Sequence, residues 1–331
     1  MPVVPRKGPS VMAGAFVALL AADLILIVVV ARVLGALARL AGQPEVVGEI
    51  LGGILLGPTV FTGTISGALF TSDIRQALST FANLGICVFM FFVGLRLNRE
   101  HLSGQGSAAA GVAIGATILP FGLGILLAVY VLGAESKVNP AAFALYIGVA
   151  MSVTAFPVLA RIIVDKRLID SAIGGISLAA AALCDVFAWM MLAAVAAMVT
   201  ADGGISQRTL LVLPFALLLL LVVRPVLARL ATSRERVTWL ASAGAVGVVG
   251  IGLALSSFAT QWMGLHFFFG AFLFGVVMPR AGFSAIRETA LPLIERVSSR
   301  VLLPVFFVVA GLNVNLRSLN GARRCLTSRS S

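Results

Sequence analysis

The sequence predicts an all-α protein with several membrane-spanning helices, and two observations carry this prediction. The composition is strongly apolar: 60% of the 331 residues are hydrophobic and 11% are charged, with a mean hydropathy of +1.08, whereas soluble domains carry roughly 25% charged residues. Apolar runs also recur along the whole chain, each long enough to cross about 30 Å of hydrocarbon as a helix. Because lipid cannot satisfy a lone backbone N–H or C=O, such runs fold as helices.

The apolar runs divide the chain into ten predicted helices of a polytopic membrane protein. The first run follows Arg6 and Lys7, as in a signal peptide, but it is too long for one. We therefore interpret it as a spanning helix. The ten ranges are 11–38, 46–61, 77–97, 107–133, 141–164, 171–199, 209–230, 237–258, 264–280 and 297–313.

The basic residues predict the orientation of these helices. The formal net charge is +11, but its residues are spread over short loops, which argues against a nucleic-acid partner. Cytoplasmic loops of membrane proteins carry an excess of Lys and Arg. With the N-terminus outside, the outer loops between helices hold only Arg75, Lys137 and Arg208. The cytoplasmic side then holds fifteen basic residues: Arg32, Arg39, Arg96, Arg99, Arg161, Lys166, Arg167, Arg224, Arg229, Arg234, Arg236, Arg280, Arg287, Arg296 and Arg300. We expect a multi-pass protein of the cell (plasma) membrane with its N-terminus outside.

Enzyme chemistry is not indicated by the sequence. The three cysteines, Cys87, Cys184 and Cys325, lie far apart and follow neither a disulfide nor a metal-binding pattern. The sequence holds no phosphate-binding loop and no nucleophile–base pair. We therefore expect neither an enzyme nor a cofactor, and no metal beyond a transported monovalent cation.

Two glycine-containing signatures recur in the same order and predict an internal duplication. Gly48–Gly53 recurs as Gly270–Gly275, and Phe91–Asn98 recurs as Val308–Asn315, about 217 to 222 positions later. Under the predicted orientation the two copies run in opposite directions through the membrane, which is typical of many secondary transporters. We expect one transmembrane transporter domain over 1–331, with a first repeat at 1–199, a linker helix at 200–236 and an incomplete second repeat at 237–331.

The second copy stops after its third helix, so we expect three helices to be missing. After Leu319 the sequence is polar and aperiodic, and it would place Arg323 and Arg324 on the outer side, against the charge rule. We interpret this end as a truncation or a reading-frame change rather than a natural outer tail. The genomic DNA beyond codon 331 is then expected to encode three further helices.

Asp185 is the clearest candidate for chemistry. It lies midway along the sixth predicted helix, among small and apolar residues, where a charge costs at least ~2.5–3.5 kcal/mol and usually marks a transport pathway. Burial disfavours its charged form, so that one carboxylate can bind either a dehydrated Na⁺ or K⁺ or a proton. Competition for this group is sufficient for exchange. The alternative is an aspartate that is paired with a neighbouring helix for structure only.

The fifth predicted helix supplies a second element, a proline in its middle. Pro157 follows Ser152, Thr154, Ala155 and Phe156, and a proline inside a helix removes a backbone hydrogen bond and clashes with the preceding turn. In transporters, a helix broken in this way exposes carbonyls and half-helix ends that coordinate an ion. The alternative is a simple kink that the Ser152 and Thr154 hydroxyls absorb.

Two further acidic residues are accessory candidates. Asp23 lies inside the first predicted helix, near the outer interface, where packing or a subunit contact is an alternative to ion binding. Glu49 lies near the cytoplasmic end of the second, where it either extends to the interface or faces an inner cavity.

Five motifs make the sequence resemble the bacterial monovalent cation:proton antiporter family, in its second superfamily branch, which includes Na⁺/H⁺ exchangers and Kef-type K⁺/H⁺ antiporters. In order along nearly the whole chain, the motifs are Pro44–Pro58, Thr154–Arg161, Leu183–Trp189, Gly270–Gly275 and Leu303–Phe307.

The resemblance implies exchange of Na⁺ or K⁺ for H⁺, with a role in pH homeostasis. It implies thirteen helices, an N-terminus outside the cell, a homodimer in the lipid bilayer, and a core with two crossed broken helices. It also implies that Asp185 is the carboxylate that carries the ion and the proton, and that Thr154 lies at the break of the first crossed helix.

The sequence departs from the family at Cys184, where relatives have Asp or Asn before the aspartate. One aspartate instead of two implies one cation per proton. The expected truncation would also remove the eleventh helix, with its basic residue near the carboxylate, and the twelfth helix, which is the second broken one. Two other interpretations stay open: a gated K⁺ efflux channel-like system, and a non-transporting truncated remnant.

Overall fold

The described part of the protein is built from helices. A computed structural model describes residues 9–60, 67, 69–97, 105–133, 139–199, 208, 211–233, 240–279, 293 and 296–316, and among these residues it contains no β-strand. The chain divides into two compact units. Unit 1 comprises Met1–Phe89 and Ile294–Ser331, and unit 2 comprises Met90–Leu293.

All ten predicted spans contain helix. Six single-element spans are α1 (Pro9–Leu40), α2 (Glu45–Leu56), α4 (Ser72–Arg96), α9 (Ala172–Val199), α13 (Leu240–Trp262) and α14 (Phe267–Val277). Four composite spans are α6 (Gly106–Leu127) with the π-helical turn η1 (Ala128–Leu132), α7 (Pro140–Ser152) with α8 (Phe156–Asp165), α11 (Val212–Leu218) with η2 (Leu219–Val223) and α12 (Arg224–Ser233), and η4 (Ser298–Leu302) with α16 (Leu303–Leu312). Six described spans are long and apolar enough to cross a membrane, as expected for a multi-pass membrane protein.

Two helices are shorter than predicted. α2 has 12 residues and α14 has 11, so each covers only about 18 Å at 1.5 Å per residue. The ranges 46–61 and 264–280 were therefore too long. Both helices end just before an X–Pro step: Gly57 precedes Pro58, and Met278, with ψ 130, precedes Pro279. Proline disfavours helical backbone at the residue before it, which ends each helix.

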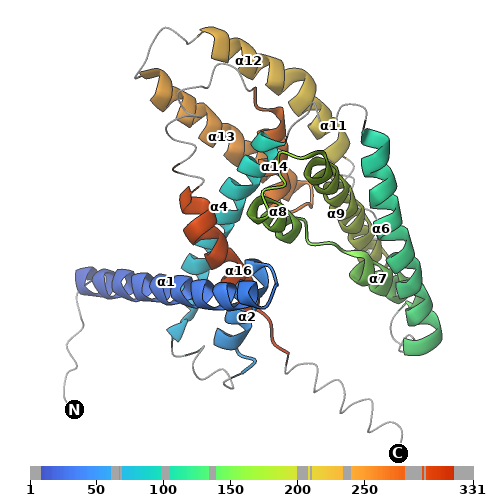
Figure 1. Ribbon diagram of the computed structural model, residues 1–331, viewed down its shortest axis with the longest axis horizontal. Coiled ribbons are helices and arrows are strands. Elements are labelled where there is room, and N and C mark those ends of the chain that lie inside the picture. Colours follow the sequence, from blue (N-terminus) through green and yellow to red (C-terminus); the bar gives the residue numbers. More distant parts are fainter. Residues whose placement is uncertain are drawn as a thin grey trace, which may run out of the picture. The chain divides into compact units, whose positions relative to one another are not determined.

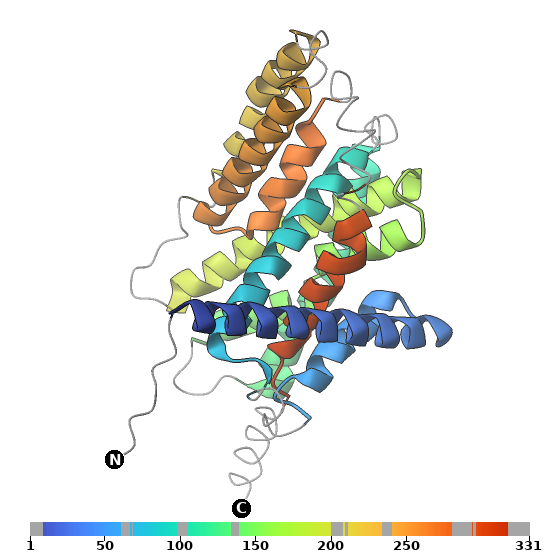
Figure 2. The same ribbon diagram turned by 90° about the vertical axis from the view of Figure 1, so that its left-hand side faces the viewer.

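In unit 1, α2 packs against both α1 and α16 (Figures 1 and 2). Both contacts run through glycine. A Cβ at Gly48 would collide with the carbonyl of Leu34, and a Cβ at Gly53 would collide with the carbonyl of Val308. The helix backbones therefore touch at these points. The apolar core beside them consists of Ile27, Ala31, Phe70, Ile74, Leu78, Ala82, Val305, Val308, Val309 and Leu312.

In unit 2, α14 packs against α13 and α4 by equivalent contacts. Gly270 meets the carbonyl of Ser256, and Gly275 meets the carbonyl of Phe91. Gly270, Ser256 and Gly275 lie 222 positions after Gly48, Leu34 and Gly53, and Phe91 lies 217 positions before Val308. These are the offsets of the two recurring signatures. The same backbone approach therefore occurs twice, in agreement with a duplicated sequence.

The turns before α2 and α14 are also equivalent. Gly42 has φ 76 and Gly264, 222 positions later, has φ 88. Both lie in the left-handed region that favours glycine. The proposed repeat boundaries at 1–199, 200–236 and 237–331 stay predictions.

The rest of unit 2 is centred on α6, α7 and α9, which contact one another (Figure 1). The backbones of α6 and α7 approach at Gly124, whose added Cβ would lie 2.8 Å from the Cα of Gly148. The short helix α8 packs on α9. This arrangement brings the break between α7 and α8 to the middle part of α9.

We expect Gly275→Ala to lower the free energy of unfolding by about 1–3 kcal/mol, because the added methyl group meets backbone that cannot rotate away. Gly250→Ala in α13 is the matched control, since nothing lies within 4 Å of its Cβ position. It should be neutral or stabilising by up to ~1 kcal/mol, because alanine is the better helix former. Thermal unfolding of both variants in detergent checks this, and equal melting temperatures would contradict the close approach of α14 and α4.

Candidate functional site

The fifth predicted span is a broken helix rather than a kinked one. α7 ends at Ser152, and the Val153 N–H still bonds the Val149 carbonyl at 2.9 Å. Val153 then takes an extended conformation, with φ −64 and ψ 125, and α8 begins only at Phe156. Figure 1 shows α7 and α8 as separate coils joined by an extended segment. The alternative of a simple kink in a continuous helix is therefore wrong.

Pro157 does not occupy a helix interior. It lies in the first turn of α8, where a residue without an N–H leaves no helical hydrogen bond unmade. The carbonyl of Ala155 begins the new helix by accepting the N–H groups of Val158 at 3.0 Å and Leu159 at 3.1 Å. The proline thus favours a helix start at this point, which is why the chain resumes a helix immediately after the break.

Asp185 faces this helix start from α9. Its side chain is buried, with 6% exposure, and its carboxylate accepts a hydrogen bond from the backbone N–H of Phe156, the first residue of α8. The first N–H groups of a helix lack intrahelical partners, and the helix dipole places partial positive charge there. The broken helix therefore stabilises a negative charge on Asp185 within an apolar span.

Ser152 is the last residue of α7, and Thr154 lies in the extended segment that follows it. Ser152 is buried, and its hydroxyl donates to the Val149 carbonyl at 3.1 Å, which leaves oxygen lone pairs as possible ion ligands. Thr154 is half-buried within the extended segment, and Ala155, which follows it, is exposed. The structure thus brings Ser152, Thr154 and Asp185 to the same break.

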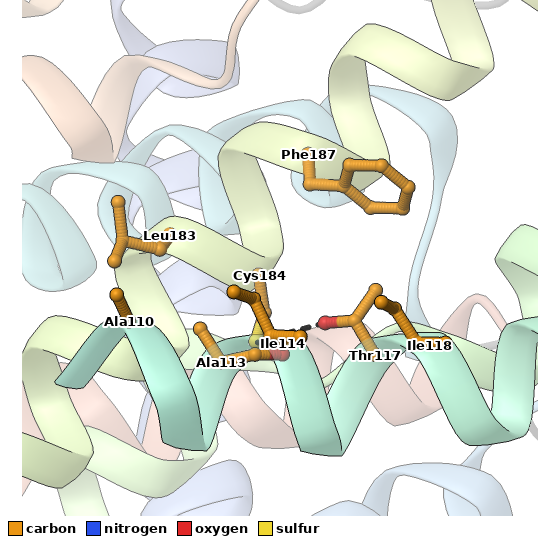
Figure 3. Close-up of a pocket in the computed structure, with 8 residues that line it drawn as sticks. All are labelled: Ala110, Ala113, Ile114, Thr117, Ile118, Leu183, Cys184 and Phe187. Atoms are coloured by element: carbon orange, nitrogen blue, oxygen red, sulfur yellow. Dashed lines mark hydrogen bonds between the residues drawn. The ribbon is translucent and has the colours of Figure 1, made fainter. Parts of the chain in front are cut away.

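Cys184 points in another direction. Its thiol accepts a hydrogen bond from the Thr117 hydroxyl at 3.2 Å and donates to the Ala113 carbonyl at 3.7 Å, so both partners belong to α6 (Figure 3). Successive helix residues are turned by about 100°, which separates this thiol from the carboxylate of its neighbour Asp185. The hydrogen bonds of Cys184 fix α9 to α6.

An apolar pocket of about 280 Å³ lies where Cys184 meets α6 (Figure 3). Three of its lining residues have at least half of their surface exposed: Ile114, Ile118 and Leu183. The lining residues belong to α6 and α9, so the pocket lies at the contact of these two helices and not at the break.

The two accessory candidates lie in unit 1. Asp23, on α1, is 5% exposed, and its Oδ2 has no hydrogen-bond partner among the described residues. Glu49, on α2, is 2% exposed. Its side chain is therefore buried, and its role at the interface or in an inner cavity stays a prediction.

Two features of the site were missed in the sequence. Arg161, used above for orientation and as the end of a family motif but not as a site residue, is 5% exposed within α8 and pairs with Asp165 at 3.0 Å. The ring of Phe156 packs against Phe269 and Phe272 of α14. An arginine six residues after the break was a visible signal, whereas contact between Phe156 and α14 required the tertiary structure.

We expect Thr117→Val and Cys184→Ala each to lower the free energy of unfolding by about 1 kcal/mol. Because the two side chains share one hydrogen bond, the double variant should lose less than the sum of the two, with a coupling of about 0.5–1 kcal/mol. Chemical unfolding of the four proteins in detergent measures this coupling. Strict additivity would show that Cys184 does not fix α9 to α6.

Comparisons with known proteins agree on the class of this chain. Residues 25–326 match the family described as "Sodium/hydrogen exchanger, transmembrane". The chain is 34% identical to Cation/H(+) antiporter 15 of Arabidopsis thaliana over 92% of its own length, but it spans only 37% of that relative. It is 33% identical to Na(+)/H(+) antiporter NhaS4 of Synechocystis, covering 91% of this chain and 75% of the relative. K(+)/H(+) antiporter 1 of Saccharomyces cerevisiae is 33% identical over 85% of this chain and 33% of its own length.

A solved structure shows the same fold. The sodium proton antiporter MjNhaP1 from Methanocaldococcus jannaschii superposes with a TM-score of 0.59 at 13% sequence identity, covering 92% of this chain and 72% of that one. The match over 25–326 assigns the sequence to a family, and the likeness to MjNhaP1 assigns the fold. The chain is a multi-pass membrane protein that belongs to the transmembrane sodium/hydrogen exchanger family.

Proposed function

We propose that this protein is a secondary antiporter that exchanges Na⁺ or K⁺ for H⁺ at Asp185. The observation that carries the proposal is the Phe156 N–H, at the start of a half-helix, bonded to a buried carboxylate in the middle of an apolar span. Membership of the sodium/hydrogen exchanger family supports it. Relatives named as Na⁺/H⁺ and K⁺/H⁺ antiporters support exchange with either cation.

The exchange follows from competition for one carboxylate. When Asp185 is charged, it attracts a monovalent cation, and we expect the oxygens of Ser152 and Thr154, which lie at the break, to complete the coordination. When Asp185 is protonated, it is neutral and holds no cation. Transport of the two species in opposite directions then requires only that the site open alternately to each side of the membrane.

The half-helix balances the two states of Asp185. An unpaired carboxylate in an apolar environment would remain protonated and would bind no cation. The Phe156 N–H and the dipole of α8 offset part of the cost of the charge. A full counter-charge at this position would compete with the cation for the carboxylate, whereas a single N–H leaves oxygen lone pairs open.

The finer features of this function extend the same proposal. The protein acts in the cell (plasma) membrane, with its N-terminus outside, as the excess of basic residues in the alternate loops indicates. It acts as a homodimer, as the resemblance of its motifs implies, and exchanges one cation per proton because the residue before Asp185 is Cys184 rather than a second acid.

In everted membrane vesicles, addition of Na⁺ or K⁺ should dissipate an imposed pH gradient, and Asp185→Asn should abolish this response. Asparagine preserves the side-chain volume and accepts the Phe156 N–H, but it cannot release a proton or neutralise a cation. Asp73→Asn is the matched control, because Asp73 is an exposed carboxylate in the first turn of α4. Its exchange should remain within about twofold of wild type, since an exposed charge at a helix start contributes only ~0.3–1 kcal/mol.

The measurement is the recovery of a pH-sensitive dye signal after each cation is added. Exchange at the wild-type rate in Asp185→Asn would exclude this carboxylate as the carrier. Asp23 and Glu49, the buried acids of unit 1, would then be replaced by Asn and Gln in the same assay.

A further inference from the structure

Phe156 makes contacts at the break with both its backbone and its side chain. Its N–H bonds the carboxylate of Asp185, while its ring is fully buried, with 0% exposure. The Phe156 N–H can stay directed at Asp185 only if the residue is held in place. The preceding segment is extended, and its helical hydrogen bonds lie at its two ends, where the Val153 N–H bonds α7 and the Ala155 carbonyl bonds α8.

The ring of Phe156 is held by α14. Phe272 meets it edge-to-face, with 4.9 Å between ring centroids and 85° between ring planes. Phe269 stacks on it at 5.9 Å and 14°. Such arrangements of two rings are favourable by ~0.5–1.5 kcal/mol beyond the area they bury. Phe269 and Phe272 are three residues apart on α14, so they lie on one face of the helix.

α14 is in turn fixed from other sides. Gly270 packs on the backbone of α13 at Ser256, and Gly275 packs on the backbone of α4 at Phe91. Phe274 stacks on Phe91 at 5.9 Å and 27°, away from Phe156. Because backbone-to-backbone contacts leave little freedom to slide, α14 presents Phe269 and Phe272 as a rigid surface.

We infer that the Phe269–Phe272 face of α14 positions the Phe156 N–H on Asp185, so that α14 sets the affinity of the site for its cation. Phe269 and Phe272 are positioning residues: they act through Phe156 and touch neither cation nor proton. The inference rests on the proposed function of Asp185 and adds to it a helix outside the broken-helix motif. The short helix α14 thereby contributes to the site.

The test compares Phe272→Leu with Phe274→Leu. Both residues are buried phenylalanines of α14, with 5% and 2% exposure, but only Phe272 contacts Phe156. Leucine keeps an apolar side chain and removes the ring edge. We expect Phe272→Leu to raise the apparent KM for Na⁺ or K⁺ roughly threefold to tenfold, less than the loss of a whole charge-assisted hydrogen bond. Vmax should stay within about twofold, since the transported groups are unchanged.

A second readout is independent of transport. A cation that binds the folded protein raises its melting temperature. The rise caused by a fixed concentration of Na⁺ or K⁺ should shrink in Phe272→Leu and stay at the wild-type size in Phe274→Leu. The melting temperature without cation reports the packing cost, which both variants share. If Phe272→Leu does not fold, Phe269→Leu takes its place, with the same expected result.

The outcomes separate this inference from the proposal on which it rests. The role of α14 is overturned if Phe272→Leu and Phe269→Leu show the same apparent KM and the same cation-induced rise in melting temperature as Phe274→Leu. Asp185→Asn would remain inactive in that case. Wild-type exchange by Asp185→Asn would overturn both proposals, because Phe156 would then position its N–H on a group that carries nothing.

Discussion

The hydrogen bond from the Phe156 N–H to the Asp185 carboxylate resolves two costs that a membrane imposes. Hydrocarbon offers no partner to an orphaned backbone N–H at a helix start, and it strongly disfavours an isolated charge. Placed together, each group satisfies the other. The break between α7 and α8 is therefore tolerated because an acid lies opposite it, and the acid is tolerated because the break supplies a donor.

Glycine contacts fix a short helix within each of the two units. Gly270 and Gly275 allow the backbone of α14 to touch α13 and α4, as small residues do at membrane helix interfaces. Gly48 and Gly53 do the same for α2 in unit 1. Since the same approaches recur at the repeat offset, one packing solution is used twice. The recurrence thus extends from the sequence motifs to individual backbone contacts.

Cys184 and Asp185 show how one helix can separate two roles. The thiol bonds α6 through Thr117 and Ala113, whereas the carboxylate faces α8. Adjacent positions on a helix point about 100° apart, so neighbours in sequence need not share a site. In this structure the residue before the carboxylate contributes to helix packing.

The sequence by itself determined the membrane class, the ten helical segments, the recurrence of the glycine signatures and the choice of Asp185 as the candidate carboxylate, because hydropathy, motif spacing and an intramembrane charge are local properties. It could not decide between a kink and a break at Pro157, since that depends on whether a partner satisfies the freed N–H. Nor could it show that Cys184 faces α6 or that Phe272 packs against Phe156. Those contacts join residues more than 60 positions apart, and only the packing of the folded helices brings such residues together.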